Sequence, residues 1–426
     1  MHSTRLTGAA SACVTLLSLL LMPYSATAQD FDDLRLNGDL KLRGVGTFFI
    51  EGNTHAISIH TARGGFSGQP GLSMIDQMHV QYMLPEKKSK SRVPLGIVHG
   101  CCLTTKSWQT TPDGRMGWDE YFVRRGFDTY MIDQVGRGRS GFDATAYNMV
   151  RTGELPCTAG TSQTGGQVVC KEIPAILIAS DQFAWNVFRW GTTACTTSPC
   201  SATTTPHPTL KFPIKTIGVG AGSNHQFYNM VVPDMNGTLS GAFDPPCASG
   251  LCTPPQPAAY FNSPSQMAKL AKKVGGMILM GHSQSSSFPT RAALQPDSGC
   301  YPWTSEKACK VKGIIQIETG CFANLDASHI NTLKHIPILI VDGDFYPTPR
   351  PQPDCVQMMT QINSAGGNMR FAHLPALTKN SLYPGSPGAM PGIEHMMMVG
   401  TKNIEVANLL IGWIDRYVKG DKHGHH

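Results

Sequence analysis

The sequence predicts an α/β fold in which helices flank a mostly parallel central sheet. Two segments near the start, 38–50 and 75–84, alternate apolar and polar residues as antiparallel strands do. Six later runs are short and almost continuously apolar, which is typical of strands buried on both faces of a parallel sheet. They cover residues 94–99, 128–133, 276–281, 313–317, 336–341 and 369–374.

Helical patterns alternate with these runs, as expected for an α/β protein. They cover residues 118–125, 284–294, 354–365 and 403–418. In the last of these segments, apolar residues from Ile404 to Val418 fall on one stripe. We therefore predict an amphipathic helix there that covers the sheet.

Residues 1–28 are predicted to be a signal peptide. Arg5 supplies the positive start, an apolar run follows at 14–22, and small residues at 26–28 form the cleavage site. The apolar run is too short to span a bilayer, and Cys13 precedes it, where the cysteine of a lipoprotein would follow it. We therefore expect a secreted or periplasmic protein without a membrane anchor.

Composition bears on three questions: whether the protein binds nucleic acid, whether it forms disulfides, and whether it holds a metal. The chain has 426 residues and a formal net charge of +6, and its basic residues are scattered, so we predict no nucleic-acid partner. Of its 13 cysteines, Cys13 lies in the signal peptide, and the even remainder favours disulfides in an exported chain. No pair of CxxC units appears, so we predict no metal site. The spacing predicts four local bridges: Cys157–Cys170, Cys195–Cys200, Cys247–Cys252 and Cys300–Cys309.

A long interruption separates two strands that should be neighbours along the chain. Residues 142–270 are rich in Thr, Ser, Pro and Gly, carry six cysteines, and show helical patterns at 179–190 and 224–232. We interpret them as a disulfide-stabilised insertion that lies over the carboxyl edge of the sheet as a lid. The alternative is an excursion that only adds stability. The α/β core would then be 29–141 and 271–420, with a flexible tail at 421–426.

The strongest local signal surrounds Ser283. The predicted strand 276–281 leads through Gly281, His282, Ser283, Gln284 and Ser285 into a helical pattern. Such a strand, turn and helix form the nucleophile elbow of α/β-hydrolases, which exposes a serine hydroxyl above the sheet. The tight turn needs small residues two positions before and after the serine. Gly281 meets this need, and Ser285, which replaces the usual Gly, meets it less well.

A serine nucleophile needs a base and an acid that orients the base. His395 is the best-placed base, because it lies between the last predicted strand and the last predicted helix. Glu318 follows the strand 313–317, whereas Asp342 and Asp344 follow the next strand. Any of the three carboxylates could accept the Nδ1 proton of His395, and topology alone slightly favours the aspartates.

Two backbone N–H groups are needed to stabilise an oxyanion. Gln284, directly after the nucleophile, is predicted to supply one. Cys101, in the loop His99-Gly100-Cys101-Cys102 after the strand 94–99, is predicted to supply the other. Adjacent cysteines can close an eight-membered disulfide ring that would fix the peptide geometry. The alternative is two separate thiols, or bridges to cysteines elsewhere.

Residues 136–141 read GRGRSG, a GxGxxG pattern directly after a strand that invites a dinucleotide-binding interpretation. No clear helix is predicted after Gly141, so no helix N-terminus is available there to bind a pyrophosphate. The chain enters the insertion instead of completing a βαβ unit. We interpret the glycines as a tight turn and predict no organic cofactor.

The stretches HGCCLTTKSWQTTPDGRMGWDEYFVRRGF, IDQVGRGRSG, GHSQSS, LPAL, EHMMM and NLLIGWI together resemble a family of bacterial α/β-hydrolases typified by an Alcaligenes esterase. The resemblance implies an exported esterase with a vicinal disulfide near the oxyanion hole, here Cys101-Cys102. It also implies a glutamate as the acid, here Glu318, which leaves Asp344 as the reserve, and a bridge that matches Cys321–Cys355.

The chain departs from that family in two places, namely a longer and more cysteine-rich insertion and a longer loop before His395. Both border the expected pocket, so the resemblance implies no substrate range.

These residues predict a serine esterase that hydrolyses a small-molecule or polymeric carboxylic ester through an acyl-enzyme. A lactonase, amidase or polyester hydrolase would use the same residues. A catalytically silent hydrolase fold used for binding is a third hypothesis, which the presence of Ser283 and His395 disfavours. The chemistry requires no cofactor or metal, and the sequence does not predict an oligomeric state.

Overall fold

The computed structural model describes residues 38–57, 71–87, 89, 92–142, 145–158, 178–217, 225–234, 258–318, 320–322 and 325–418. The predicted signal peptide and the predicted tail lie outside these residues. Among the helices that are described, none combines the length and the apolar character needed to cross a bilayer.

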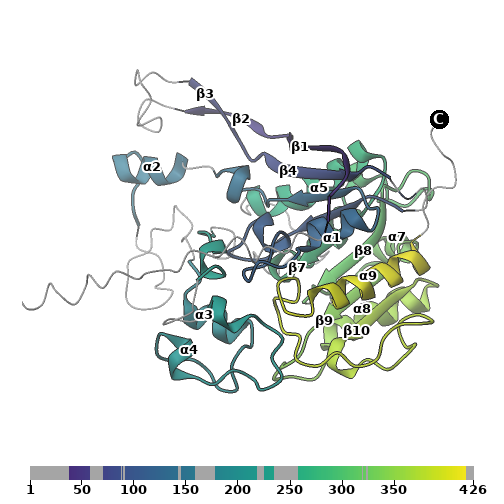
Figure 1. The fold of residues 1–426 in the computed structure, drawn as a ribbon. Helices are drawn as coiled ribbons and strands as arrows, with labels where there is room; N and C mark the ends of the chain where they lie inside the picture. Colours follow the sequence, from purple (N-terminus) through teal and green to yellow (C-terminus); the bar gives the residue numbers. More distant parts are fainter. Residues whose placement is uncertain are drawn as a thin grey trace, which may run out of the picture.

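An eight-stranded sheet forms the centre of the protein (Figure 1). In order across the sheet, its strands are β1 (Leu42–Ile50), β4 (Met78–Pro85), β6 (Thr129–Ile132), β5 (Leu95–Val98), β7 (Met277–His282), β8 (Val311–Ile317), β9 (Ile338–Asp342) and β10 (Met369–His373). The β1–β4 and β4–β6 pairs are antiparallel, and every later pair is parallel. The predicted mostly parallel sheet that opens with antiparallel strands is confirmed.

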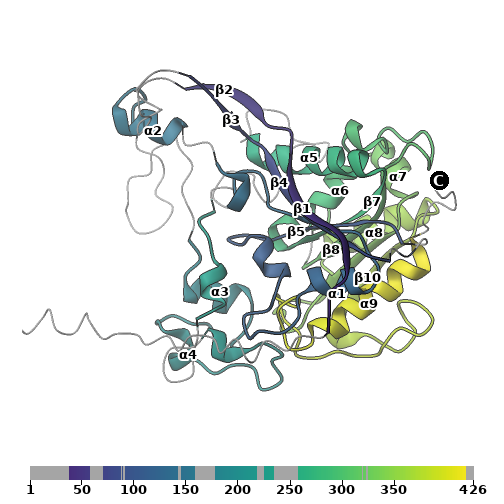
Figure 2. The same ribbon diagram turned by 45° about the horizontal axis from the view of Figure 1, so that its top comes forward.

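The first hairpin is more divided than predicted. A second antiparallel pair, β2 (Asn53–Ile57) and β3 (Gly71–Ile75), extends it away from the main sheet (Figures 1 and 2). The two parts join at Gly52 and at Asp76, where φ is +124° and +59°. Because these positive φ values interrupt the extended backbone, the predicted strand 75–84 is divided between β3 and β4.

The register of the parallel strands brings their carboxyl ends together. Val98 at the end of β5 pairs with Gly281 in β7, and His282 pairs with Ile317 in β8. Ile317 in turn pairs with Val341 in β9. The residues that follow these strands, including Ser283 and Glu318, therefore leave the sheet at one edge.

Helices cover both faces of the sheet, and each face carries its own apolar core. Ile97 and Val98 of β5 belong to different cores, because successive residues of a strand point to opposite faces. The core of Ile97 includes α1 (Trp118–Arg124), α9 (Asn403–Tyr417) and much of the insertion. The core of Val98 includes α5 (Ala258–Val274), α6 (Phe288–Ala293), α7 (Ala327–Leu333) and α8 (Pro353–Ser364).

Helix α5 corrects the predicted boundary between insertion and core at 270/271. It begins at Ala258 and continues through that boundary. Met267, Ala268, Leu270 and Ala271 are fully buried in the same core as Val98. The segment that rejoins the sheet therefore starts earlier than the break in sequence pattern suggests.

The described part of the insertion consists of short elements. Its α-helices are α2 (Thr145–Thr152), α3 (Asp181–Val187) and α4 (Cys200–Thr203), and its 3-10 turns are η4 (Ile214–Thr216) and η5 (Tyr228–Met230). The helix predicted at 179–190 is the shorter α3. The helix predicted at 224–232 is only the turn η5, because His225 has a φ of +52° and Pro233 follows closely.

Other 3-10 turns lie at the strand ends and between helices: η2 (Thr105–Trp108), η3 (Gly138–Ser140), η7 (Ser283–Ser285), η8 (Pro296–Ser298) and η9 (Leu374–Ala376). Helix α2 follows η3 closely, which corrects the expectation that no helix follows Gly141.

Three disulfides confirm expected pairs. Two are the local bridges Cys195–Cys200 and Cys300–Cys309. The third, Cys321–Cys355, is the bridge that the family resemblance implied, and it ties the segment after β8 to α8. Cys157 is also disulfide-bonded. Its expected partner and the expected Cys247–Cys252 pair lie outside the described residues.

Candidate active site

Ser283 is the first residue of η7, directly after β7, and has a φ of +56°, a left-handed conformation that is unusual for a serine. A Cβ atom on Gly281 would lie 2.1 Å from the carbonyl oxygen of Ser285, so only glycine fits there. The side chain of Ser285 is accommodated because its hydroxyl accepts a hydrogen bond from the His282 N–H at 3.1 Å. The turn therefore has the geometry of a nucleophile elbow.

The helix predicted at 284–294 is interrupted. The chain first forms η7, and α6 begins only at Phe288, with Pro289 in its first turn. Proline has no N–H group and is tolerated in the first turn but not in the interior of a helix, so a continuous helix from Gln284 is disfavoured.

Ser283, His395 and Glu318 lie in one hydrogen-bonded row. The Nε2 atom of His395 is 2.9 Å from the Ser283 hydroxyl oxygen. Its Nδ1 atom is 2.8 Å from Oε2 of Glu318. Glu318 and His395 are buried, whereas Ser283 is partly exposed. The arrangement presents an alcohol, an imidazole and a carboxylate in the order that proton transfer requires.

The two aspartates that topology favoured do not contact His395. Asp342 forms a buried ion pair with Arg350, and the Asp344 carboxylate accepts a hydrogen bond from the Gly392 N–H at 2.8 Å. The position beside His395 Nδ1 is occupied by Glu318, whose Oε1 accepts a hydrogen bond from the Gly343 N–H at 2.7 Å. Of the three carboxylates that the residues alone left open, Glu318 is therefore the one that contacts His395 in this structure.

Glu318 has two further partners besides His395 and Gly343. The guanidinium of Arg189 donates to its Oε2 at 2.9 Å, and the Tyr346 hydroxyl donates to the same oxygen. Burial alone would raise the pKa of Glu318, but the cation of Arg189 and the contact with His395 hold it well below its usual value. Glu318 is thus a carboxylate at neutral pH.

His395 is held as a neutral imidazole. Burial lowers its pKa, Glu318 opposes this effect, and Arg189 adds to it. The ring of Phe188 lies almost parallel to the imidazole, with 5.0 Å between ring centroids. The Nε2–H of His282 faces the backbone carbonyl oxygen of His395 at 2.9 Å, which ties the histidine loop to β7. A neutral imidazole in this position can accept the proton of Ser283.

The loop predicted to form the oxyanion hole passes directly against Ser283. A Cβ atom on Gly100 would lie 2.9 Å from the Ser283 Cβ, so the backbone can approach only because residue 100 is glycine. The predicted donors Cys101 and Gln284 belong to the two segments that meet here.

A buried ion pair fastens these two segments to each other. Arg137, from the loop after β6, pairs with Asp234 of the insertion, and their side chains are 1% and 0% exposed. Arg137 also donates to the Gly100 carbonyl at 3.0 Å and to the Gln284 side chain at 3.1 Å. Asp234 accepts the Cys102 N–H at 3.2 Å and the Gln284 amide at 3.2 Å. One pair thus contacts both sides of the expected oxyanion hole.

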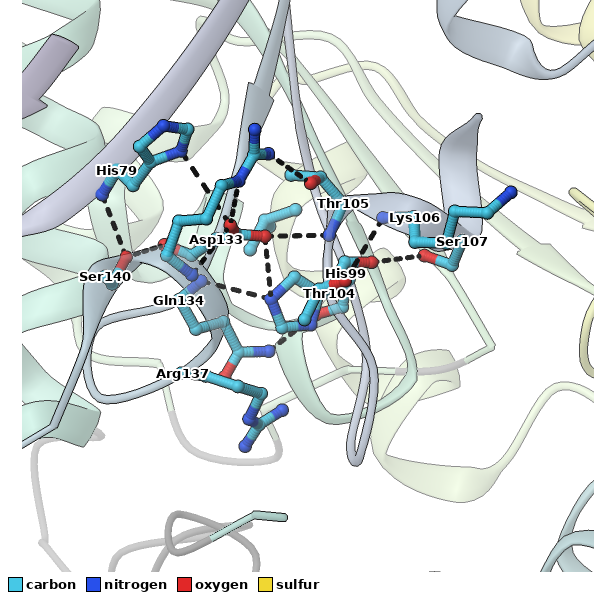
Figure 3. Close-up of polar contacts among 12 residues, drawn as sticks. His79, His99, Thr104, Thr105, Lys106, Ser107, Asp133, Gln134, Arg137 and Ser140 are labelled. Atoms are coloured by element: carbon cyan, nitrogen blue, oxygen red, sulfur yellow. Dashed lines mark hydrogen bonds and ion pairs between the residues drawn. The ribbon is translucent and has the colours of Figure 1, made fainter. Parts of the chain in front are cut away.

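A second polar network holds the loop at residues 99–102 (Figure 3). Asp133 accepts hydrogen bonds from the Thr105 N–H at 2.8 Å and from the Arg139 side chain at 3.0 Å. Burial lowers the pKa of His99 to about 4, so its ring is neutral at neutral pH. Since the Gln134 N–H donates to His99 Nε2 at 3.1 Å, the ring proton is assigned to Nδ1, which faces the Gly100 carbonyl at 2.8 Å. The 136–141 motif thus supplies side chains that hold the loop.

Cys101 and Cys102 are free cysteines in this structure, so the vicinal disulfide that the family resemblance implied is not formed. The Cys102 sulfur instead lies 4.0 Å from an Asp234 oxygen, and the two sulfurs lie within 4.8 Å of each other. The neighbouring Cys102 side chain, together with burial, raises the pKa of the Cys101 thiol.

The two sulfurs and an Asp234 oxygen lie within 4.8 Å of one another, which is a spacing that a metal ion could use. The Arg137 cation already compensates the Asp234 carboxylate, so a second cation would meet repulsion there. We therefore assign Asp234 to holding the loop.

Sequence reasoning singled out neither Arg189, Phe188 nor Asp234, although all three contact the residues of the site. They lie in the insertion, where no motif marks them, and the helical pattern at 179–190 was the one available signal. Within the described part of the insertion, Phe188 contacts His395 and Arg189 contacts Glu318.

Comparison with known proteins finds similarity to hydrolases. A solved structure described as a novel bacterial esterase aligns with a TM-score of 0.67 and 30% identity, covering 90% of this chain and 98% of that chain. A probable secreted lipase, phiG, from a fungal species (strain ATCC 74256) is 36% identical over 63 residues. That match spans 15% of this chain and 17% of the lipase.

The thioesterase domain from the curacin biosynthetic pathway aligns with a TM-score of 0.33 and 10% identity over 85% of this chain and 99% of that domain. No protein-family model matches the chain. The identity and near-complete coverage of the first structure, together with the sheet and elbow, show that this chain belongs to the family of bacterial α/β-hydrolases that the esterase represents.

Proposed function

We propose that the protein hydrolyses carboxylic esters through an acyl-enzyme formed on Ser283. The Ser283 oxygen attacks the acyl carbonyl while His395 Nε2 takes the hydroxyl proton. His395 then returns this proton to the departing alcohol, and a water molecule, activated by the same imidazole, releases the acid. Glu318 holds the Nδ1 proton of His395 and stabilises the imidazolium formed in each step.

The observation that carries the proposal is the row of contacts from Ser283 to His395 and from His395 to Glu318, at 2.9 and 2.8 Å. The left-handed backbone of Ser283 supports it, because this conformation exposes the hydroxyl above the sheet edge. The similarity to a bacterial esterase supports an ester as the substrate.

We further propose that the backbone N–H groups of Cys101 and Gln284 bind the oxyanion of the tetrahedral intermediate. Gly100 lies against Ser283, and the Arg137–Asp234 pair contacts both donor segments. A hole fixed before the substrate arrives requires little reorganisation during the reaction, which is the condition for effective electrostatic stabilisation.

Action outside the cytoplasm completes the proposal. Three described disulfides, a further bonded cysteine at position 157, and a local match to a probable secreted lipase support export. The insertion would act as a fixed cover of the site, since Phe188 and Arg189 contact the base and the acid.

Labelling with a fluorophosphonate probe tests the nucleophile without knowledge of the natural substrate. The wild type should be labelled at Ser283, and Ser283→Ala should lose both the label and p-nitrophenyl ester turnover by more than about 1,000-fold. Ser364→Ala, at an exposed position at the end of α8, is the control and should behave as the wild type. Turnover by Ser283→Ala within about tenfold of the wild type would refute the proposal.

A substrate panel then distinguishes the ester hypothesis from its relatives. Short-chain and long-chain p-nitrophenyl esters, a lactone, an anilide and a polyester film would be compared by kcat/KM or, for the film, by product release. We expect the soluble esters to rank first. A higher kcat/KM on the lactone or the anilide would replace the esterase assignment with a lactonase or an amidase.

A further inference from the structure

Arg189 lies beside the acid and the base, and the chemistry outlined above does not require it. It follows α3 in the insertion and has a φ of +61°, a backbone conformation that few non-glycine residues adopt. Its side chain is 9% exposed. A nearly buried cation in an unusual backbone conformation next to a catalytic carboxylate needs a specific explanation.

Three contacts hold the guanidinium in one place. Its Nε–H donates to the backbone carbonyl of Asp344 at 2.8 Å, and Nη2 donates to Glu318 Oε2 at 2.9 Å. Its carbon atom lies 3.8 Å from the centre of the Tyr346 ring. The planar group is therefore fixed by a carbonyl, a carboxylate and an aromatic face, each of which arginine is suited to bind.

The placement has a direct consequence for His395. The Nη1 atom of Arg189 is 3.5 Å from His395 Nδ1. At this distance a positive guanidinium repels an imidazolium much more than a neutral imidazole. In addition, Glu318 Oε2 accepts hydrogen bonds from Arg189 and Tyr346 as well as from His395, so its negative charge is shared among three donors.

We propose that Arg189 is a positioning residue that shares the Glu318 carboxylate with His395 and thereby extends the action of the base to lower pH. The inference rests on the proposed function, in which His395 must be neutral to accept the Ser283 proton. Without Arg189, Glu318 would stabilise the imidazolium more strongly, and the base would become protonated at a higher pH.

The other titratable groups around His395 do not compete with this effect in acid solution. His282 faces it from β7, and burial lowers the pKa of His282 to about 3. Glu394 precedes it in the chain, and burial raises the pKa of Glu394 to about 8. Burial and Glu318 raise the pKa of Tyr346, which donates to Glu318. Between about pH 3 and about pH 8, therefore, Arg189 and Glu318 are the charged groups in the described structure that act on His395.

The experiment compares the pH dependence of kcat/KM for a short-chain p-nitrophenyl ester in four proteins. They are the wild type, Arg189→Met, Arg189→Lys and the control Arg416→Met, which removes an exposed cation on α9. We expect Arg189→Met to move the acid midpoint upward by on the order of one pH unit. Arg189→Lys should stay much closer to the wild type because it keeps the charge, and Arg416→Met should match the wild type.

An unchanged acid midpoint in folded Arg189→Met would overturn the inference, and so would equal shifts in the Met and Lys variants, because the effect would then not follow the charge. Circular dichroism would establish folding. If Arg189→Met does not fold, Arg189→Gln provides a second neutral variant that keeps an amide donor for Glu318.

A direct titration separates this inference from the proposed function. In the Ser283→Ala background, which needs no turnover, the His395 ring would be titrated by NMR and assigned by comparison with His395→Gln. Adding Arg189→Met should raise the His395 midpoint by a similar amount. If the wild type shows no fluorophosphonate label while this shift is present, the proposed function fails but the electrostatic role of Arg189 stands.

Discussion

The ring of Phe188 lies parallel to the imidazole of His395, with an angle of 11° between the planes. Phe188 also contacts Trp190 and Phe227 edge to face, so it links the aromatic core of the insertion to the proposed base. The orientation of His395 therefore depends on a side chain of the insertion, which does not belong to the central sheet. This relationship leads to a first prediction.

Replacing Phe188 with Leu should lower kcat more than it raises KM. The stack limits rotation of the imidazole, and an aromatic pair contributes about 0.5–1.5 kcal/mol beyond its buried area. We therefore expect kcat to fall by about 2- to 13-fold in ester turnover. Trp303→Leu removes a comparable stack on His335 elsewhere and should leave kcat unchanged. An equal loss in both variants would argue against a role for the Phe188 stack.

Gly281→Ala should prevent formation of the elbow. The added Cβ would lie 2.1 Å from the Ser285 carbonyl oxygen, a distance that requires the backbone to move. Fluorophosphonate labelling and the melting temperature should both drop. Gly388→Ala is the matched control, because its new Cβ would have ordinary contacts of 3.7 Å or more. Normal labelling of Gly281→Ala would show that the turn differs from the one described.

For the Arg137–Asp234 pair, we predict that a double substitution restores stability without restoring activity. Removing one partner, as in Asp234→Leu, leaves a buried charge without its counterion and should cost about 3–5 kcal/mol in urea unfolding. The double variant Arg137→Met/Asp234→Leu removes both charges and should recover much of this stability. Its kcat should stay low, since Gly100 and Gln284 lose their shared partners. Recovery of kcat in the double variant would contradict the proposed positioning role of the pair.

Because of Glu394, we predict that the stability of the folded protein declines as the pH rises. Burial raises its pKa from an ordinary 4.5 to about 8. Between these two values the unfolded state releases the proton while the folded state keeps it, so the free energy of unfolding falls as the pH increases through this window. One such group contributes a slope of at most about 1.4 kcal/mol per pH unit. Below the window the contribution is fully present.

Urea unfolding at about pH 5 and about pH 8 measures this slope. Glu394→Gln should flatten it, because a glutamine does not titrate. Part of the slope should persist, since burial also raises the pKa of Asp119 to about 7. Glu405→Gln, at an exposed position on α9, should keep the wild-type slope. If Glu394→Gln and the wild type show the same slope, Glu394 is ionised in the folded protein.

The sequence predicts those parts of the site that local constraints determine. A buried strand followed by a tight turn leaves a recognisable pattern around Ser283, and His395 is placed by its position between the last strand and the last helix. The choice of Glu318 over the aspartates was not visible in the residues alone. It depends on which carboxylate reaches the imidazole, and family resemblance supplied it.

The residues that the sequence did not reveal act across long separations. Arg189 is 129 residues from Glu318, and Arg137 is 97 residues from Asp234. Such pairs follow no periodicity, because they are formed only when the insertion folds back over the sheet edge. The N-terminal boundary of α5 was missed because the helix begins inside a segment whose composition resembles a loop.

The fold-back of the insertion has a consequence for engineering. Phe188, Arg189 and Asp234 of the insertion contact the residues of the proposed active site, so the sheet alone does not supply the whole of that site. A minimised enzyme without the insertion would lose activity even if its eight strands assembled. Variation of substrate range should instead begin at surface positions of the insertion and spare these three anchors.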